Sequence, residues 1–449
     1  MSIVDRRPTL QSPRTPTRRD VLTASAIAAT GALLTPHVSL AQVGSDERVV
    51  IGLIGAGGRG TSVAAGFAAL PNVVVKYACD VDPKRAETAA GTIGKKAPEG
   101  ALKPVPLADF RRMLDDKDVT AVAIATPNHW HAPAAILAAS AGKHVYVEKP
   151  CSHNPREGEL LVEAARKHNR CIQHGTQRRS WAKIIEAMDK VKSGAIGPVR
   201  VARCWYTNSR KSIGKGMPAA PPDGLDWALW QGPAPAKEFR DNYLPYTWHW
   251  FWHWGNGECG NNGVHGLDLG RWGLGVDCPK SVTSSGGRYY FDDDQETPDT
   301  QWTTFDYGDK LLTWEGKSCH PRGVEATASG FGVAFYGEQG TIVLDSSGYT
   351  TYDTKNKEVA VVKPGKGEAG DDLHFNNFLA AVRANDPKKL TAEVAEAASS
   401  ALLCHLANIA QRTGHTLHLD PQTKQLKNDD ADAKKRWSRE YQKGWEPKV

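Results

Sequence analysis

Residues 48–60 read RVVIGLIGAGGRG, and this stretch decides the first half of the fold. The apolar run 48–54 predicts a buried strand, and the spaced glycines that follow predict a tight turn into a helix over residues 61–69. Gly55 permits the turn, Gly57 lets backbone N–H groups approach a pyrophosphate, and Gly60 lets the helix lie close to the strand. The helix N-terminus then faces the phosphates with the positive end of its dipole. The stretch therefore predicts a dinucleotide-binding turn.

The choice of dinucleotide depends on Asp80, which ends the second predicted strand. A carboxylate at this place accepts hydrogen bonds from the adenosine ribose hydroxyls, whereas a 2'-phosphate would meet a like charge. NAD is therefore favoured over NADP. Lys84 and Arg85 follow closely and would soften that repulsion if they turned inward.

Strands and helices alternate as far as residue 174, which predicts a doubly wound parallel sheet of the Rossmann type over residues 42–178. Further strands are expected at 121–125, 144–148 and 171–174, and further helices at 83–92, 107–114, 131–141 and 155–167. After residue 178 the pattern changes to strand-like runs between 199 and 345 and two closing helices, 371–384 and 392–412. These elements predict a second, α+β domain over residues 179–420, with an open and mostly antiparallel sheet. Residues 421–449 form a charged tail.

The first 41 residues resemble a twin-arginine export signal. Arg18 and Arg19 precede a mildly apolar run, and a small-residue site follows, so cleavage is expected after Ala41. This predicts a periplasmic or secreted protein, exported in the folded state by the twin-arginine machinery and without a membrane anchor after cleavage. Because the cytoplasm makes NAD and the outside holds no comparable pool, we expect a cofactor that is loaded before export, tightly held and internally recycled.

Composition excludes several other classes. The formal net charge of +6 over 449 residues is too mild to indicate a nucleic-acid partner. The eight cysteines show no CxxC pairing and so predict neither a zinc knuckle nor a disulfide framework, although a pair could still oxidise outside the cell. Exposed sheet faces would allow a homo-oligomer.

Three segments should meet beyond the carboxyl ends of the first sheet, where ligands bind in such folds. They are residues 126–131 (TPNHWH), residues 148–150 (EKP) and the loop after His174. With the glycine turn, this arrangement resembles the Gfo/Idh/MocA family of glucose-fructose oxidoreductase and inositol dehydrogenase over residues 48–420. The resemblance implies that Lys149 is catalytic. An ammonium beside the reacting oxygen would stabilise its alkoxide character, and a positively charged nicotinamide would lower the pKa of the lysine.

The cofactor-binding residues expected from the turn, Asp80 and the resemblance are Gly55, Gly57, Gly58, Arg59, Gly60, Asp80, Thr126, Pro127, Asn128, His131, Glu148 and Lys149. The expected substrate-binding residues are Trp130, Arg178, Trp252, Asn261, His265 and Asp268.

The motif at 261–268 departs from the resembled family. Members often have Asp-x-Gly-x-His-x-x-Asp, whereas this chain has Asn261 in place of the first aspartate. His265 keeps its position and is expected to shuttle the hydroxyl proton, with Asp268 one helical turn away. Because an asparagine cannot act as a base, simple alcohol oxidation by a lysine, aspartate and histidine set is in doubt.

Eight of the fourteen tryptophans lie between Trp205 and Trp272, including the run WHWFWHW at 248–254. Flat indoles with an N–H group suit sugars, but the run could equally be a core clamp. No carboxylate or cysteine accompanies the histidines of this run as further metal ligands, so no metal site is predicted.

The sequence thus predicts an exported, NAD-dependent oxidoreductase acting on a hydroxyl of a small carbohydrate or polyol. One alternative is a redox-neutral glycoside hydrolase or lyase that uses NAD through a transient keto-sugar. Another is a non-catalytic sugar-binding protein that kept the fold.

Overall fold

The computed structural model describes residues 47–320, 329–427 and 429–449. The expected export signal lies outside these residues, so it stays a prediction. Within the described ranges, no helix is both long and apolar enough to cross a bilayer. All eight cysteines are free thiols.

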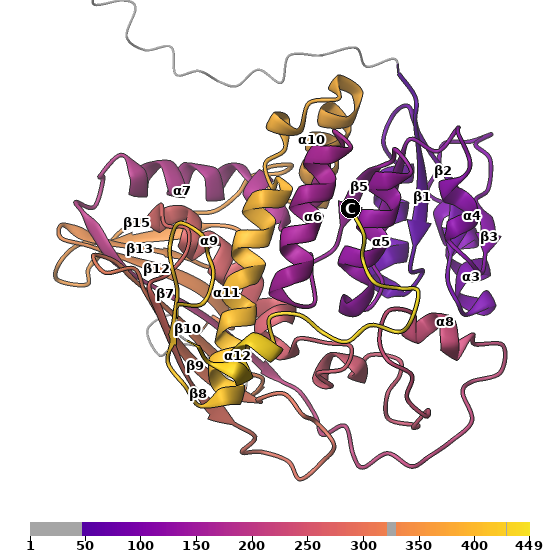
Figure 1. The fold of residues 1–449 in the computed structure, drawn as a ribbon. Helices are drawn as coiled ribbons and strands as arrows, with labels where there is room; N and C mark the ends of the chain where they lie inside the picture. Colours follow the sequence, from indigo (N-terminus) through magenta and orange to yellow (C-terminus); the bar gives the residue numbers. More distant parts are fainter. Residues whose placement is uncertain (1–46, 321–328, 428) are drawn as a thin grey trace, which may run out of the picture. The chain divides into compact units, whose positions relative to one another are not determined.

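A six-stranded parallel sheet forms the first half, in the order β3-β2-β1-β4-β5-β6 (Figure 1). Its strands are β1 Val49–Ile54, β2 Val73–Cys79, β3 Val105–Leu107, β4 Ala121–Ile124, β5 His144–Val147 and β6 Ile172–His174. Every residue of β1, β4 and β5 is buried, as expected for strands covered on both faces. The predicted doubly wound sheet is confirmed. The helix predicted at 107–114 is wrong in its first half, because Leu107 belongs to the edge strand β3 and only Arg111–Leu114 is helical.

Helices cover both faces of this sheet. They are α2 Gly58–Ala68, α3 Pro83–Gly94, α4 Arg111–Leu114, α5 Asn128–Ser140 and α6 Pro155–Lys167. Asp82 and Asn154 cap α3 and α6 by accepting backbone N–H groups. A late helix, α10 Asp371–Ala384, joins the same core, with the Phe375 ring 4.3 Å from that of Phe67.

The second sheet has ten strands, and its predicted mostly antiparallel character is confirmed. Nine strands follow the order β15-β14-β13-β12-β7-β10-β9-β8-β16, and β11 pairs with β7. The strands are β7 Val199–Ser209, β8 Ser281–Gly287, β9 Thr300–Asp306, β10 Leu311–Lys317, β11 Cys319–His320, β12 Phe331–Gly337, β13 Gly340–Leu344, β14 Tyr349–Tyr352, β15 Glu358–Val362 and β16 Leu417–His418. The long strand β7 lies between β12 and β10 and is parallel to β10.

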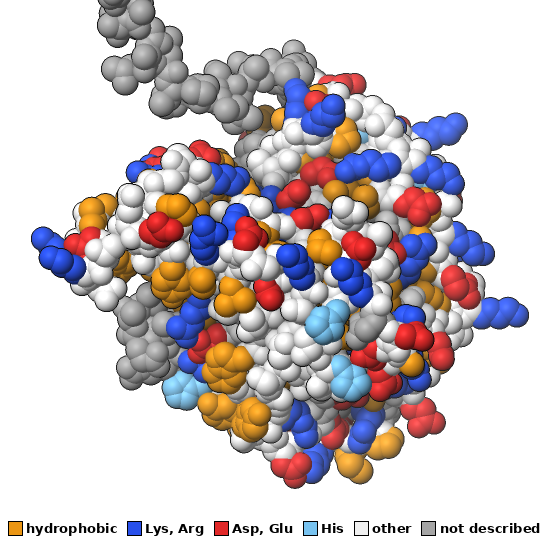
Figure 2. Space-filling model, turned by 60° about the vertical axis from the view of Figure 1, so that its left-hand side comes forward, with side chains coloured by type: hydrophobic (Ala, Val, Ile, Leu, Met, Phe, Trp, Pro, Cys, Tyr) orange, Lys and Arg blue, Asp and Glu red, His pale blue; other side chains and the backbone are white. Residues whose placement is uncertain are grey.

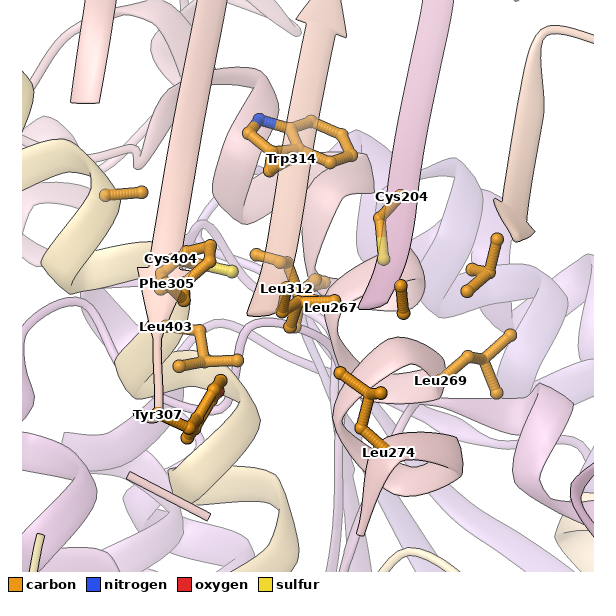
Figure 3. Close-up of a cluster of buried hydrophobic side chains, with 14 of the residues drawn as sticks. Cys204, Leu267, Leu269, Leu274, Phe305, Tyr307, Leu312, Trp314, Leu403 and Cys404 are labelled. Atoms are coloured by element: carbon orange, nitrogen blue, oxygen red, sulfur yellow. The ribbon is translucent and has the colours of Figure 1, made fainter. Parts of the chain in front are cut away.

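One face of this sheet is covered by α7 Ala182–Lys192, α9 Val264–Leu274 and α11 Val394–Thr413 (Figure 1). Figure 3 shows α9 and α11 packing Leu267, Leu269, Leu274 and Leu403 against sheet residues such as Leu312 and Trp314. Helix α9 can approach the sheet closely because Gly270 has no side chain; a Cβ there would lie 2.7 Å from the Cys204 sulfur. This close packing fixes the start of α9, and with it residues 261–265.

The remaining elements are short. Helix α8 Trp227–Gln231 lies in the long connection after β7, and α12 Ala431–Lys435 begins the C-terminal tail. The tail runs back across α6 to α5 (Figure 1), where Trp445 packs edge-on against Trp130 with ring centroids 5.0 Å apart. On the face drawn in Figure 2, basic and acidic side chains are interspersed.

Candidate active site

A cleft of about 1530 Å³ opens at the carboxyl ends of β1, β2, β4 and β5. One wall comes from the glycine turn and the loops after these strands. The other comes from the end of β7 and from the connection that carries α8 and the tryptophan run. The predicted site residues that line it are Gly55, Gly57, Gly58, Arg59, Asp80, Thr126, Pro127, Asn128, Trp130, His131, Glu148, Lys149 and Asn261.

The glycine turn has the geometry that a dinucleotide requires. Gly55 has φ +90°, and a side chain there would lie 2.7 Å from the Thr126 nitrogen. A side chain at Gly60 would lie 1.9 Å from the Gly55 carbonyl oxygen, so α2 can approach the turn only without one. Side chains at Gly57 and Gly58, by contrast, would meet nothing within 4 Å. The turn therefore leaves room for phosphates at the N-terminus of α2.

Asp80 holds the glycine turn in place. Its Oδ2 accepts the Ala56 N–H at 2.8 Å and its Oδ1 accepts the Asp82 N–H at 3.0 Å. Burial raises the pKa of Asp80, and the two backbone donors oppose that rise. Since each carboxylate oxygen accepts more than one hydrogen bond, ribose hydroxyls can still bind here. The ribose-binding role of Asp80 stays a prediction.

Arg59 is turned toward the strand ends rather than toward the expected phosphate position. Its Nε donates to Glu148 at 2.7 Å and its Nη1 to Asp371 at 2.5 Å. Burial would lower the pKa of Arg59, but these carboxylates outweigh it and raise it. Arg59 likewise holds the pKa of the buried Glu148 below its ordinary value, although burial acts in the opposite direction. The ion pair therefore anchors α2 to β5 and α10 beside the cleft.

The segment 126–131 adds polar atoms at the same edge. Both ring nitrogens of His131 face carbonyl oxygens, with Nδ1 2.6 Å from Pro150 and Nε2 2.8 Å from Thr126. These contacts tie the two loops together. Thr126 Oγ1 and Asn128 Oδ1 are buried in the cleft wall without a hydrogen-bond partner. Such unsatisfied groups fit a bound ligand that would pair with them.

Lys149 lies beside Asn261. Its Nζ donates to the Asn261 backbone oxygen at 2.7 Å and to the side-chain Oδ1 at 2.8 Å. Burial lowers the pKa of Lys149, and Glu148 and Glu258 only partly compensate. The Asn261 amide in turn donates to the Tyr246 hydroxyl at 3.0 Å. The lysine is thus fixed by a neutral partner.

Asp268 does not line the cleft, and its expected substrate-binding role stays a prediction. The carboxylate is 1% exposed and accepts Arg179 Nε at 2.8 Å and the Ser400 hydroxyl at 2.7 Å. It therefore joins α9 to α11 and to the loop after β6. His265 is also buried and outside the cleft lining, and burial with nearby positive charges lowers its pKa far below its ordinary value. Its Nδ1 has no hydrogen-bond partner.

Three other expected substrate-binding residues have structural contacts. The Trp130 Nε1 donates to the Trp230 carbonyl at 2.9 Å, and the residue is part of the cleft lining. Arg178 lies outside the lining and donates to the Ser346 carbonyl at 3.1 Å. Trp252 also lies outside, with the Arg412 guanidinium 4.5 Å from its ring centroid.

The tryptophan run is mostly core. Trp248, Phe251 and Trp254 pack with Trp230 and Tyr243 into a separate aromatic cluster. Part of the run also reaches the cleft, through Trp248 and His249. Among the described residues, no group of three or more His, Cys, Asp or Glu side chains is arranged to hold a metal ion.

Sequence reasoning missed several cleft residues from the second half. They are Tyr206 and Asn208 at the end of β7, and Tyr246 before the tryptophan run. Arg210 also lines the cleft and donates to the buried Glu258 at 2.5 Å. The alternation of β7 was a usable signal for the first pair, whereas Tyr246 lies in an irregular segment without periodicity.

Fold and cleft together define a protein with a parallel sheet of the dinucleotide-binding type and a second, mostly antiparallel sheet. The model of the oxidoreductase family's NAD-binding Rossmann fold matches residues 49–176, and that of its C-terminal alpha/beta domain matches residues 226–411. The chain belongs to the Gfo/Idh/MocA oxidoreductase family, whose first domain binds NAD.

Relatives include a levoglucosan dehydrogenase of Pseudarthrobacter phenanthrenivorans, 28% identical over 237 residues (51% of this chain, 52% of the relative). An alpha-N-acetylgalactosaminidase of Shewanella oneidensis is 32% identical over 209 residues (46% and 40%). A glycosyl hydrolase family 109 protein of Saccharopolyspora erythraea is 38% identical over 129 residues (28% of each). The chain thus spans about half the length of these relatives or less.

Solved structures share the fold across both domains. A levoglucosan dehydrogenase in complex with NADH and levoglucosan has a TM-score of 0.65 at 20% identity, covering 83% of this chain and 99% of the other. The WlbA dehydrogenase of Bordetella pertussis, in complex with NADH and UDP-GlcNAcA, has a TM-score of 0.63 at 19% identity, with the same coverage. At such identities the similarity concerns the fold.

Proposed function

We propose that the protein is an NAD-dependent oxidoreductase that acts on a hydroxyl of a sugar or polyol. The observation that carries this proposal is the position of Lys149, a partly buried ammonium that lines the same cleft as the open glycine turn. NAD bound along residues 55–60 would supply the hydride acceptor. The substrate would lie between Lys149 and the wall formed by Tyr206, Arg210 and Tyr246.

Lys149 has a defined role in this proposal. Oxidation of a hydroxyl carbon builds negative charge on its oxygen, and a preorganised ammonium in a cleft of low polarity stabilises that charge. Asn261 directs the ammonium by two hydrogen bonds without neutralising it. The Arg59–Glu148 ion pair supports the strand end that carries the lysine.

Tight retention of the cofactor is supported by a cover segment, residues 210–246, which extends over the nucleotide half of the cleft. Ala219, Pro222 and Leu225 of this segment line the same cleft as Asp80. The Asp226 N–H donates to the Val81 carbonyl at 3.1 Å, so the cover contacts the loop after β2 directly. A cofactor held in this way would be recycled internally.

The cover can be tested through Leu225→Ala, which removes apolar contact area from the cleft wall. We expect the wild-type protein to retain nucleotide through gel filtration and the variant to lose it faster. Equal retention by both proteins would contradict this role of the cover.

A redox-neutral glycosidase is the second candidate. Oxidation of a ring hydroxyl acidifies the neighbouring C–H, which permits elimination of the anomeric group, addition of water and re-reduction. Two observations favour it: a neutral Asn261 beside the lysine, and relatives named as glycosyl hydrolases.

One experiment separates the candidates: incubation of purified protein with aryl glycosides in deuterated water. Stoichiometric NADH, or keto-sugar formed only with an added acceptor, supports the oxidoreductase. Leaving-group release with deuterium beside the transient ketone and without accumulated NADH supports the glycosidase. If neither reaction is observed and Lys149→Ala binds sugars as well as the wild type does, the protein is a non-catalytic sugar-binding protein.

We also propose export through the twin-arginine pathway, on the strength of Arg18 and Arg19 and the small-residue site before residue 42. A periplasmic or secreted location fits a cofactor that does not exchange with a cellular pool.

A further inference from the structure

His249 is placed in the cleft by a 3₁₀ turn, Thr247–Trp250, which follows the cover segment. Its ring packs against Trp248, with centroids 3.5 Å apart, and against Tyr246 at 4.2 Å. The side chain is only 8% exposed and lines the same cleft as Lys149 and Asn261. The imidazole is therefore held rigidly.

The backbone fixes the tautomer of this ring. His249 Nδ1 lies 2.7 Å from the Tyr246 carbonyl oxygen, which can only accept, so Nδ1 carries the proton. In a neutral imidazole the other nitrogen, Nε2, then has a lone pair and no hydrogen. Nε2 makes no hydrogen bond to any residue in the described ranges, and it is not one of their fully buried unpartnered atoms, so it stays accessible on a side chain that lines the cleft.

Burial keeps the ring neutral. It lowers the pKa of His249 well below its ordinary value; the hydrogen bond to the Tyr246 carbonyl acts in the opposite direction, and the nearby cations Lys149 and Arg210 lower the pKa further. The ring therefore carries an acceptor that persists at neutral pH. It requires a donor, and an acceptor-only ligand such as a ketone or a carboxylate cannot satisfy it.

This acceptor lies close to the reacting position. Lys149 contacts Asn261, Asn261 contacts the Tyr246 hydroxyl, and the Tyr246 ring packs on His249. We propose that His249 Nε2 forms a subsite that accepts a hydrogen bond from a second hydroxyl of the substrate ring, distinct from the hydroxyl that is oxidised beside Lys149. This inference rests on the proposed function and deepens it, since it requires a polyhydroxylated ligand rather than a simple alcohol.

The test uses a pair of variants from the same run. His249→Asn keeps an amide donor that can reach the Tyr246 carbonyl but removes Nε2. His253→Asn is the matched control, because His253 Nε2 already donates to the Pro235 carbonyl at 2.7 Å and the side chain is outside the cleft lining. Sugar binding is measured by calorimetry on the full-length protein with NADH, using levoglucosan, methyl β-D-glucopyranoside and phenyl N-acetyl-α-D-galactosaminide. For the sugar that binds best, the monodeoxy analogues are compared with the parent.

We expect one monodeoxy analogue to bind the wild type roughly 10- to 100-fold more weakly, because the bound sugar displaces water from Nε2 and that analogue offers no donor in its place. His249→Asn should weaken the parent sugar similarly and abolish the difference between the parent and that analogue, which is the signature of a direct contact. His253→Asn should bind like the wild type. In ¹⁵N NMR of the histidine rings, the His249 signal should show a protonated Nδ1 and a bare Nε2.

Two results would overturn the subsite while leaving the proposed function intact: unchanged discrimination among deoxy sugars in a catalytically active His249→Asn, or a proton on Nε2. If the wild type bound none of the sugars, the proposed substrate class would fail and the subsite with it.

Discussion

Replacing Asn261 by aspartate would place a carboxylate where the structure has a neutral amide, with almost no change in shape. The Asn261 Oδ1 lies 2.8 Å from Lys149 Nζ. At that separation, two unit charges attract by about 6 kcal/mol at an effective dielectric constant of 20. Part of this attraction is offset by the cost of removing the new carboxylate from water. The net effect of one opposite charge at this range is a pKa shift of about 1 to 3 units, or about 1.4 to 4 kcal/mol.

The sign of the shift follows from the wild-type environment. Burial lowers the pKa of Lys149, so the wild-type amine loses its proton at a lower pH than an exposed lysine does. A carboxylate partner favours the charged form and raises the pKa. Asn261→Asp should therefore keep Lys149 protonated to higher pH, and the limb of the pH–rate profile that reports this group should move upward by the same amount.

The pKa can be measured without substrate, by ¹³C NMR of labelled lysine side chains, with Lys149→Gln identifying the signal. Asn208→Asp is the control, because it adds the same charge to the cleft wall at a residue that contacts Tyr206 instead of the lysine. It should shift the Lys149 pKa much less. An unmoved or lowered pKa in Asn261→Asp would refute the assigned contact between the two side chains.

Three further predictions concern the glycine turn, the buried ion pair and export. Gly57→Ala should fold normally yet bind NAD at least 10-fold more weakly, because its methyl group would enter the space left for the phosphates. Gly60→Ala should weaken NAD binding and also lower the melting temperature, because its methyl group would clash with the Gly55 carbonyl oxygen. Normal NAD binding by both variants would contradict the role of the glycine turn as the phosphate-binding site. Asp268→Asn should lower the free energy of unfolding by about 3–5 kcal/mol, because it removes the buried carboxylate that pairs with Arg179 and leaves only the half-exposed Glu396, 3.4 Å away; an unchanged denaturant midpoint would refute this. Burial raises the pKa of Asp268, but Arg179 outweighs this effect and holds the pKa below 3.8. The stabilisation by the ion pair is therefore complete above about pH 4 and is lost as the pH falls through the pKa of the folded state. Asp268→Asn should remove this pH dependence. Replacing Arg18 and Arg19 by lysine should leave the precursor in the cytoplasm, and unchanged secretion on immunoblots of cell fractions would argue against the signal.

Much of the fold follows from local patterns. The glycine turn was readable because its main constraints are local: Gly55 has a positive φ, and Gly60 lies against the Gly55 carbonyl oxygen five residues earlier. The buried runs that form β1, β4 and β5 are apolar enough to identify by themselves. The edge strand β3 was missed because it is three residues long and mostly exposed. The central place of β7, beside strands far along the chain, depends on packing that no local pattern records.

Within the site too, the residues that follow local patterns could be predicted, whereas those placed by long-range packing could not. Lys149 stands at the end of a recognisable strand, so its place at the sheet edge could be inferred. The ion pair of Asp268 could not be predicted, because its partner Arg179 comes from a loop 89 residues earlier and helix spacing alone cannot reveal that partner. The cleft positions of Tyr246 and His249 depend on an irregular connection held by an aromatic cluster.

The account depends most directly on a dinucleotide in the cleft beside Lys149. The decisive measurement is the nucleotide content of the purified protein, read by chromatography of the supernatant after denaturation and by titration of the emptied protein with NAD. We predict close to one NAD or NADH per chain, and submicromolar rebinding that Gly57→Ala weakens. Denatured protein that releases no pyridine nucleotide, together with a titration that detects no uptake of NAD or NADP, would contradict the proposed function.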